Sequence, residues 1–127
     1  MIEVLGNPKY KRIYLAGPIT DLPNLNKEEF KKYEEKFLNL NFEVINPHNL
    51  FTKEEIDKID KELEDGKINK DEHWAFFMKK CIPEMIKSDL IAMLPKWEKS
   101  KGANLEVYNA RSLYMPIVDA INLQELF

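Results

Sequence analysis

Short apolar runs that alternate with helical stretches constrain the fold of this chain more than any other feature. Residues 12–16 (RIYLA) form one such run and end at Gly17–Pro18, which is typical of a buried strand followed by a tight turn. Residues 27–40 carry apolar side chains at helical spacing, and residues 42–45 (FEVI) form a second strand that stops at Asn46–Pro47. A strand, a helix and a strand so close together predict a right-handed parallel unit.

The helix expected over residues 27–40 has a start signal and an apolar face. Asn26 and Glu29 have the spacing of a capping box, in which each side chain bonds a backbone amide at the start of the helix. The residues that recur on one face are Phe30, Tyr33, Phe37 and Leu38. This face is expected to pack against the sheet.

The middle of the chain is more charged and less regular. Thr52 and Glu55 have capping-box spacing, so residues 53–65 are expected to form a helix. Its apolar stripe is thin and consists of Ile56, Ile59 and Leu63. Such a stripe favours a lid or an oligomer contact over a place in the core. We therefore expect a charged helical excursion at about residues 48–72 and, from its exposed stripe, a homo-oligomer.

Another helix is expected from His73 onwards. Its apolar face consists of Trp74, Phe77, Met78, Cys81, Ile82, Met85 and Ile86. Pro83 has no backbone N–H to donate to the carbonyl one turn earlier, so the helix is expected to kink or restart near Cys81. Trp74 and Phe77 could stack on a ligand, but their helical spacing favours a place in the core.

The rest of the chain completes one domain over residues 1–127. Strands are expected at residues 90–94 and 115–118, a helix at 101–113, and a final docked turn at 123–127. The expected fold is α/β, with three layers (α/β/α) and a flavodoxin-like or Rossmann-like arrangement. Its sheet is expected to be mostly parallel, with four or five strands.

Composition argues against several classes of protein. The net charge is −3 with both signs interspersed, so neither a nucleic-acid polymer nor a membrane surface is an expected partner. Cys81 is the only cysteine, and His48 and His73 lack partners at metal-ligand spacing, so no metal or other cofactor is expected. There is no apolar run of membrane-spanning length and no signal-peptide core, so we expect a cytoplasmic protein.

Residues 97–106 (WEKSKGANLE) contain the residue types most suited to chemistry. Ser100 is expected to cap the following helix, whose free N–H groups and positive dipole end favour an anion. Gly102 and Ala103 are expected to leave the approach to this helix end open. Glu106, on the second turn, is expected to stay ionised and could act as a nucleophile. The alternative is a surface glutamate on an amphipathic helix.

Three loops are expected to meet at the carboxyl ends of the strands, where parallel sheets bind ligands. They contain Tyr14 to Pro18, Asn46–Pro47, and Pro95 to Glu106. Trp97 lies in a polar stretch of the third loop and is a candidate to line a pocket.

This combination of motifs resembles the nucleoside 2-deoxyribosyltransferase-like superfamily. It is most similar to the small, often phage-associated branch of the DUF4406 type, related to 2′-deoxynucleoside 5′-monophosphate N-glycosidases. The matching segments are IYLAGP at 13–18, Asn26 and Phe30, VINP at 44–47, and SDLIAMLPKWEKSKGANLE at 88–106. The last segment is the most specific, because its order of strand, Trp, Ser, Gly-Ala and Glu is unlikely to recur by chance.

The resemblance implies roles for individual residues. Glu106 matches the nucleophile that attacks the anomeric carbon of a 2-deoxyribosyl group, and Tyr14 matches the residue that orients this carboxylate. Ser100 and the N–H groups near Gly102 resemble a 5′-phosphate cradle. Other positions expected to contact a nucleoside or nucleotide are Gly17, Pro18, Asn46, Trp97 and Ala103. Asp89 has either a structural role or a substrate contact.

One departure from the pattern concerns the leaving base. Relatives usually have an Asp that handles its proton, and the same spacing ahead of Asp89 reaches Cys81, which is better suited to being a small buried hydrophobe. The acid then comes from Asp71, Glu72 or His73, or the activity is weak or absent. The hypotheses are an enzyme that cleaves or transfers at an N-glycosidic bond, a nucleotide-binding module of the same fold, and an interaction protein.

Overall fold

The computed structural model describes residues 3–20 and 22–127 of the chain, and in these residues the sheet has four strands, all parallel. The strands are β1 (Arg12–Ala16), β2 (Glu43–Ile45), β3 (Leu90–Met93) and β4 (Ile117–Asp119). The α-helices are α1 (Lys27–Asn39), α2 (Lys53–Glu64), α3 (Lys70–Ile86) and α4 (Lys101–Ser112). The strand order β2-β1-β3-β4 is the flavodoxin-like order, so the predicted α/β fold is confirmed.

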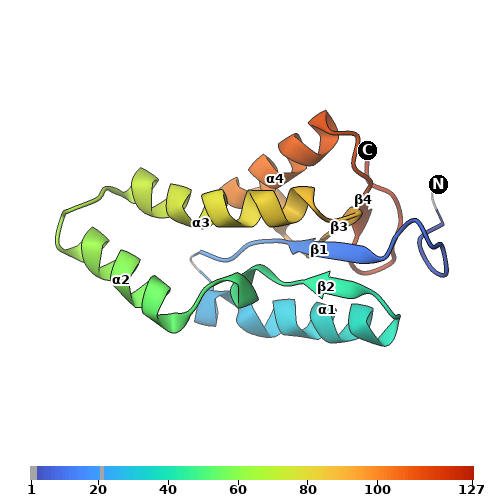
Figure 1. Cartoon of the computed structure of the whole chain (residues 1–127), viewed down its shortest axis with the longest axis horizontal. Helices are drawn as coiled ribbons and strands as arrows, with labels where there is room; N and C mark the ends of the chain where they lie inside the picture. Colours follow the sequence, from blue (N-terminus) through green and yellow to red (C-terminus); the bar gives the residue numbers. More distant parts are fainter. Residues whose placement is uncertain (1–2, 21) are drawn as a thin grey trace.

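Helices cover both faces of the sheet. Helix α1 lies on one face, and α3 and α4 lie on the other (Figure 1). The alternation of side chains along β1 explains the two cores, because Ile13 and Leu15 pack with the α1 side while Tyr14 and Ala16 face α3 and α4. Tyr14 pairs with Ile45 on one side and with Ile91 on the other, so it lies in the middle of the sheet.

Helix α1 differs from the expectation at its start and on its face. It begins after Asn26, but Asn26 has a left-handed backbone (φ 59°) and makes no capping bond. Its side chain instead donates to the Pro18 carbonyl at 2.9 Å, because the preceding 3-10 turn, Pro23–Asn26, brings it back over the end of β1. Leu38 is 51% exposed, so the predicted apolar face is wrong at this residue.

The charged excursion is a pair of helices that projects beyond the carboxyl ends of the strands (Figure 1). Helix α2 has the predicted capping box between Thr52 and Glu55, and a second box between Asn69 and Glu72 starts α3. The two helices are joined by an ion pair from Lys80 to Glu55 at 2.9 Å and by a hydrogen bond between His73 Nε2 and Asp60 Oδ1 at 2.7 Å.

The apolar stripe of α2 is not the free surface that was expected. Ile59 is buried, and Ile56 and Leu63 are partly buried. The stripe therefore gives no exposed face from which to argue for an oligomer.

Helix α3 runs through Pro83 without a break, so the predicted restart near Cys81 is wrong. Pro83 lies close to the end of the helix, and the carbonyl that loses its donor belongs to Lys79, an exposed residue that water can reach. Cys81 and Met85 are buried as expected, whereas Ile86 is 46% exposed.

The end of the chain adds a bridge to the sheet in place of the expected final turn. Strand β4 covers Ile117–Asp119, slightly later than predicted, because Tyr114 has a positive φ of 57° and turns the chain after α4. Val118 then pairs in antiparallel fashion with Glu125. Among the described residues, no helix is long and apolar enough to cross a membrane.

Candidate active site

The side chains of Tyr14 and Glu106 meet beneath helices α3 and α4. Glu106 lies on the buried side of α4 together with Ala103, Val107 and Ala110, the spacing of one helical face. The Tyr14 hydroxyl donates a hydrogen bond to Oε2 of Glu106, and both side chains are almost fully buried. The predicted contact between these two residues is therefore confirmed, and the surface-glutamate alternative is wrong.

Burial controls the charge of Glu106. It raises the pKa of Glu106 from its ordinary 4.5 to about 8, and the hydrogen bond from Tyr14 only partly opposes this rise. This rise argues against the expectation that Glu106 stays ionised, because a single donor and a helix dipole do not replace the lost water. Burial and the neighbouring Glu106 also hold the pKa of Tyr14 well above its ordinary value.

Cys81 lies in the same cluster and is a neutral thiol. Burial, followed by the nearby Glu106, raises the pKa of Cys81 to about 12. It packs with Tyr14, Ala103 and Val107, as expected for a small buried hydrophobe. A thiol that holds its proton so tightly is a poor donor to a leaving base.

The alternative acids lie at the far end of α3. Asp71 and Glu72 are exposed, the Glu72 carboxylate accepts a hydrogen bond from the Asn69 backbone N–H at the helix start, and His73 is paired with Asp60. At a helical rise of 1.5 Å per residue, Glu72 lies roughly 14 Å along α3 from Cys81. The structure does not bring these acids to Glu106.

The start of α4 has the predicted cap. Ser100 accepts a hydrogen bond from the Ala103 amide at 3.1 Å. The approach beside Gly102, however, is filled by α3, because a Cβ at this position would lie 3.2 Å from Sδ of Met78 and 3.7 Å from Nε1 of Trp74. The expectation of an open approach is therefore wrong on this side. Lys101 lies above the Trp74 ring, with its Nζ 4.0 Å from the ring centroid.

Comparison with protein families decides the affiliation of the chain. Residues 11–119 match the family described as Domain of unknown function (DUF4406). The chain belongs to this family. The match covers every strand, all four α-helices, and both Tyr14 and Glu106. A search of curated proteins finds no match.

In this DUF4406 domain the other predicted residues at the carboxyl ends of β1 and β2 have structural contacts. Gly17 allows close approach of the strands, because a Cβ there would lie 2.8 Å from Cβ of Leu94. Pro18 is buried and its carbonyl accepts from Asn26. Asn46 is buried and accepts from the His48 amide at 3.0 Å. These residues shape the end of the sheet where ligands bind in such folds.

Trp97 is half-buried in a short 3-10 turn before α4. Its ring contacts Phe127 edge-on, with 6.0 Å between the centroids. Two surface hollows stand out on the described residues, and Trp97 lines neither. Tyr14 and Glu106 do not line them either.

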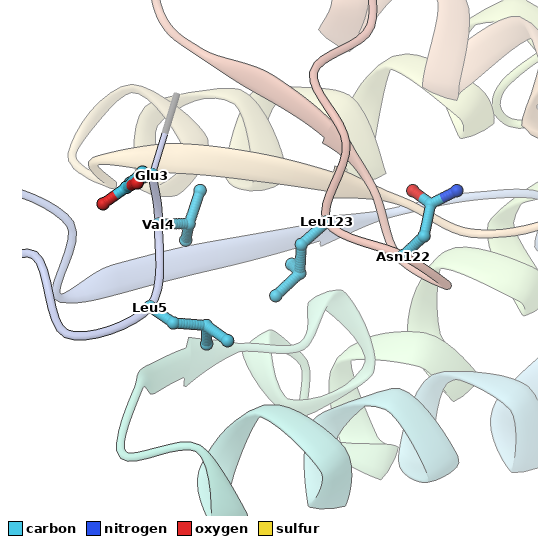
Figure 2. A pocket seen from close by; sticks show the side chains of 5 residues that line it. All are labelled: Glu3, Val4, Leu5, Asn122 and Leu123. Carbon is cyan, nitrogen blue, oxygen red and sulfur yellow. The ribbon is translucent and has the colours of Figure 1, made fainter. Parts of the chain in front are cut away.

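The first hollow lies far from the candidate site in the fold. Figure 2 shows its lining, which comes from the amino-terminal segment and from the loop after β4. It has a volume of about 360 Å³ and is lined by Glu3, Val4, Leu5, Asn122 and Leu123. Its one ionisable side chain is Glu3, and none of the predicted site residues lines it.

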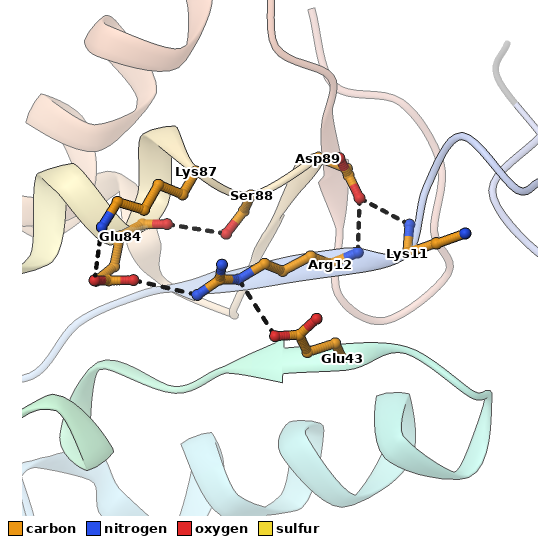
Figure 3. Close-up of polar contacts among 7 residues, drawn as sticks. All are labelled: Lys11, Arg12, Glu43, Glu84, Lys87, Ser88 and Asp89. Carbon is orange, nitrogen blue, oxygen red and sulfur yellow. Dashed lines mark hydrogen bonds and ion pairs between the residues drawn. The ribbon is translucent and has the colours of Figure 1, made fainter.

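Asp89 lies at the amino end of β3, away from the ends that carry the candidate site. It accepts hydrogen bonds from the amides of Lys11 and Arg12 at 2.9 and 2.8 Å (Figure 3). The Arg12 side chain in turn bonds Glu84 at 3.2 Å and lies 3.7 Å from Glu43. Of the two roles considered for Asp89, these contacts support the structural one.

His48 was considered from the sequence only as a metal ligand, yet it has features of a binding residue. Its Nε2 is buried and has no hydrogen-bond partner among the described residues. Burial, followed by the charge of Lys27, lowers the pKa of His48 to about 4, so the ring is neutral. Its position directly after Asn46–Pro47, at the carboxyl end of β2, is the sequence signal that identifies it.

Proposed function

We propose that the protein cleaves or transfers at the N-glycosidic bond of a 2′-deoxynucleoside or its 5′-monophosphate through a covalent deoxyribosyl–Glu106 intermediate. The observation that carries this proposal is the buried hydrogen bond between Tyr14 and Glu106. It lies beside β1 and β3, between which the strand order reverses, and ligands of such sheets bind there. The resemblance of residues 88–106 to the nucleoside 2-deoxyribosyltransferase-like superfamily supports the same assignment.

In the proposed reaction, an ionised oxygen of Glu106 attacks C1′ of the sugar. The C1′–N bond breaks, its electron pair leaves with the base, and the base takes up a proton from solvent water. Water or a second base then attacks C1′ and releases Glu106, which gives hydrolysis or transfer. Tyr14 holds the carboxylate in place by its hydrogen bond. Glu106 must lose its own proton before attack, since a neutral carboxyl group is a poor nucleophile.

A monophosphate is the favoured form of the substrate. The capped start of α4 offers free backbone N–H groups near Ser100, and Lys101 adds a positive charge. These groups suit a phosphate better than a free hydroxyl.

A second candidate is a nucleotide-binding module without catalysis. Cys81 favours it, because a neutral thiol occupies the place expected for the acid, and Asp71 and Glu72 lie far away. An interaction protein that uses the fold only as a scaffold is less well supported, since Glu106 is turned towards Tyr14.

The two candidates are separated by one incubation experiment. The protein is mixed with a panel of deoxynucleosides and their 5′-monophosphates, and released base is measured by chromatography. The enzyme predicts release from at least one compound, with monophosphates favoured. Binding of a monophosphate in calorimetry with no base release from any compound would reject the enzyme and support the binding module.

A further inference from the structure

Glu106 is buried beside helix α3. Cys81 packs against the same cluster as Glu106, and Met78 lies against Gly102 one turn earlier on α4. The Glu106 side chain is only 5% exposed. Because Cys81 and Met78 of α3 pack on this part of α4, a movement of α3 would expose the carboxylate to a substrate.

The two halves of α3 are held very differently. Its carboxyl-terminal part is fixed to the sheet, because Met85 is fully buried and Glu84 pairs with Arg12 at 3.2 Å. Its amino-terminal part projects past the ends of the strands and packs against α2, as Figure 1 shows.

Pro83 lies at the boundary between these halves. It removes one backbone hydrogen bond from the helix, so the turn from Lys79 to Pro83 resists bending less than its neighbours. An open apolar groove of about 420 Å³ lies along the seam between α3 and α4 here. The groove is lined by Trp74, Ala75, Met78, Lys79, Ile82, Pro83 and Leu105.

Two contacts close the seam above this groove. The Lys101 ammonium lies 4.0 Å from the centroid of the Trp74 ring, a cation–π contact between α4 and the projecting part of α3. Met78 fits into the space left by the missing Cβ of Gly102. Both contacts lie at the start of α4, beside the Ser100 cap.

We propose that α2 and the projecting part of α3, residues 53–82, form a lid that bends near Pro83 to admit substrate to Glu106, and that the Lys101–Trp74 contact latches the lid shut. The purpose given to the lid rests on the proposed function, but the motion itself does not. Closure excludes water from Glu106 during the reaction, and opening is required for exchange of substrate and product.

Cys81 provides a direct probe of the lid, because it is the only cysteine and is 5% exposed. Its labelling by an aromatic disulfide reagent such as DTNB is followed by absorbance at low denaturant, with no substrate present. Lys101→Met is expected to speed labelling about two- to fivefold, the range for loss of an exposed cation–π contact. Lys99→Met is the matched control, since Lys99 is an exposed lysine on the turn before α4, and it should leave the rate unchanged.

Gly102→Ala is a second variant, which should make the lid open more readily without making the whole fold less stable. The added methyl presses on Met78 and should speed labelling, while alanine is the better helix former and should not lower the free energy of unfolding. Labelling should also depend on denaturant more weakly than global unfolding does. Equal rates in Lys101→Met and Lys99→Met, or labelling that follows global unfolding in every variant, would overturn the lid.

The lid and the enzyme can fail separately in these experiments. If Cys81 is labelled through local opening but no compound releases base, the lid proposal is supported and the proposed reaction is rejected. Base release from a protein whose Cys81 is labelled only on global unfolding removes the lid and retains the reaction.

Discussion

The Glu106 carboxyl group is the proposed nucleophile, yet its burial disfavours the ionised form. Glu106→Gln tests whether this carboxylate is the nucleophile. The amide is nearly the same size and can still accept from Tyr14, so the fold and ligand binding should persist. Base release should fall on the order of 10⁴-fold or more, because an amide does not form the glycosyl ester. Chromatographic turnover and calorimetric binding measure the two effects. Glu98→Gln, at an exposed position on the 3-10 turn before α4, is the control.

Ser100 is expected to affect substrate choice more than the chemical step. Ser100→Ala removes the acceptor for the Ala103 amide at the start of α4 and should lower the free energy of unfolding by about 1 kcal/mol. The loss should raise KM for monophosphates more than for nucleosides, since a hydroxyl donor and an ordered helix start are lost together. Equal changes for both substrate classes would contradict a phosphate site at Ser100.

At the scale of the element, α3 is the helix whose sequence departs most from helical preference. Pro83→Ala restores a donor for the Lys79 carbonyl. We expect the free energy of unfolding to rise by about 1–2 kcal/mol, after allowing for the greater freedom of the unfolded alanine chain. Urea denaturation measures this change, and Cys81 labelling should slow at the same time. A fall in stability would show that the proline ring makes a packing contribution larger than the missing bond.

Local patterns predicted most elements, because strand and helix periodicities are properties of adjacent residues. β1 was predicted at its observed bounds, and the box at Thr52 was correctly assigned. The errors depend on distant contacts. The Asn26 side chain donates to the Pro18 carbonyl across a loop and does not cap the helix. The raised pKa of Glu106 depends on its burial, which comes from packing between distant elements. The family resemblance, not spacing, implied the pairing of Tyr14 with Glu106, and it gave no sign that both side chains would be buried beside α3.

At the scale of the whole molecule, the predicted homo-oligomer needs a surface other than α2. Leu105 lines the groove beside α3, and Tyr108, one turn later on α4, is 71% exposed. If the chain self-associates, this outer side of α4 is the expected contact. Light scattering should then show an oligomer that Tyr108→Glu converts to a monomer. Leu38→Glu, at an exposed leucine on α1, should have no effect.

The pH dependence of stability follows from two buried groups with opposite effects. The pKa of Glu106 is raised to about 8 in the folded protein, so the folded state binds the proton more tightly than the unfolded chain does. Its contribution is therefore complete below the unfolded value of 4.5 and is lost as pH rises to about 8. The pKa of His48 is lowered to about 4, so its neutral ring makes the fold gain stability as pH rises from about 4 to 6.5.

Between about pH 4.5 and 6.5, the contributions of Glu106 and His48 to the free energy of unfolding change in opposite directions. From pH 6.5 to 8, only the contribution of Glu106 still changes. The parent protein should therefore lose stability above pH 6.5, whereas Glu106→Gln should not. Over the whole range, burial of Glu106 implies a loss on the order of 5 kcal/mol. Denaturation curves at pH 5, 6.5 and 8 measure the difference between the two proteins. In His48→Asn, the free energy of unfolding should decline already from pH 5, because the opposing contribution of His48 is gone. Parallel curves for all three proteins would mean that Glu106 is ionised in the closed fold, and that its carboxylate needs no opening of α3 to become a nucleophile.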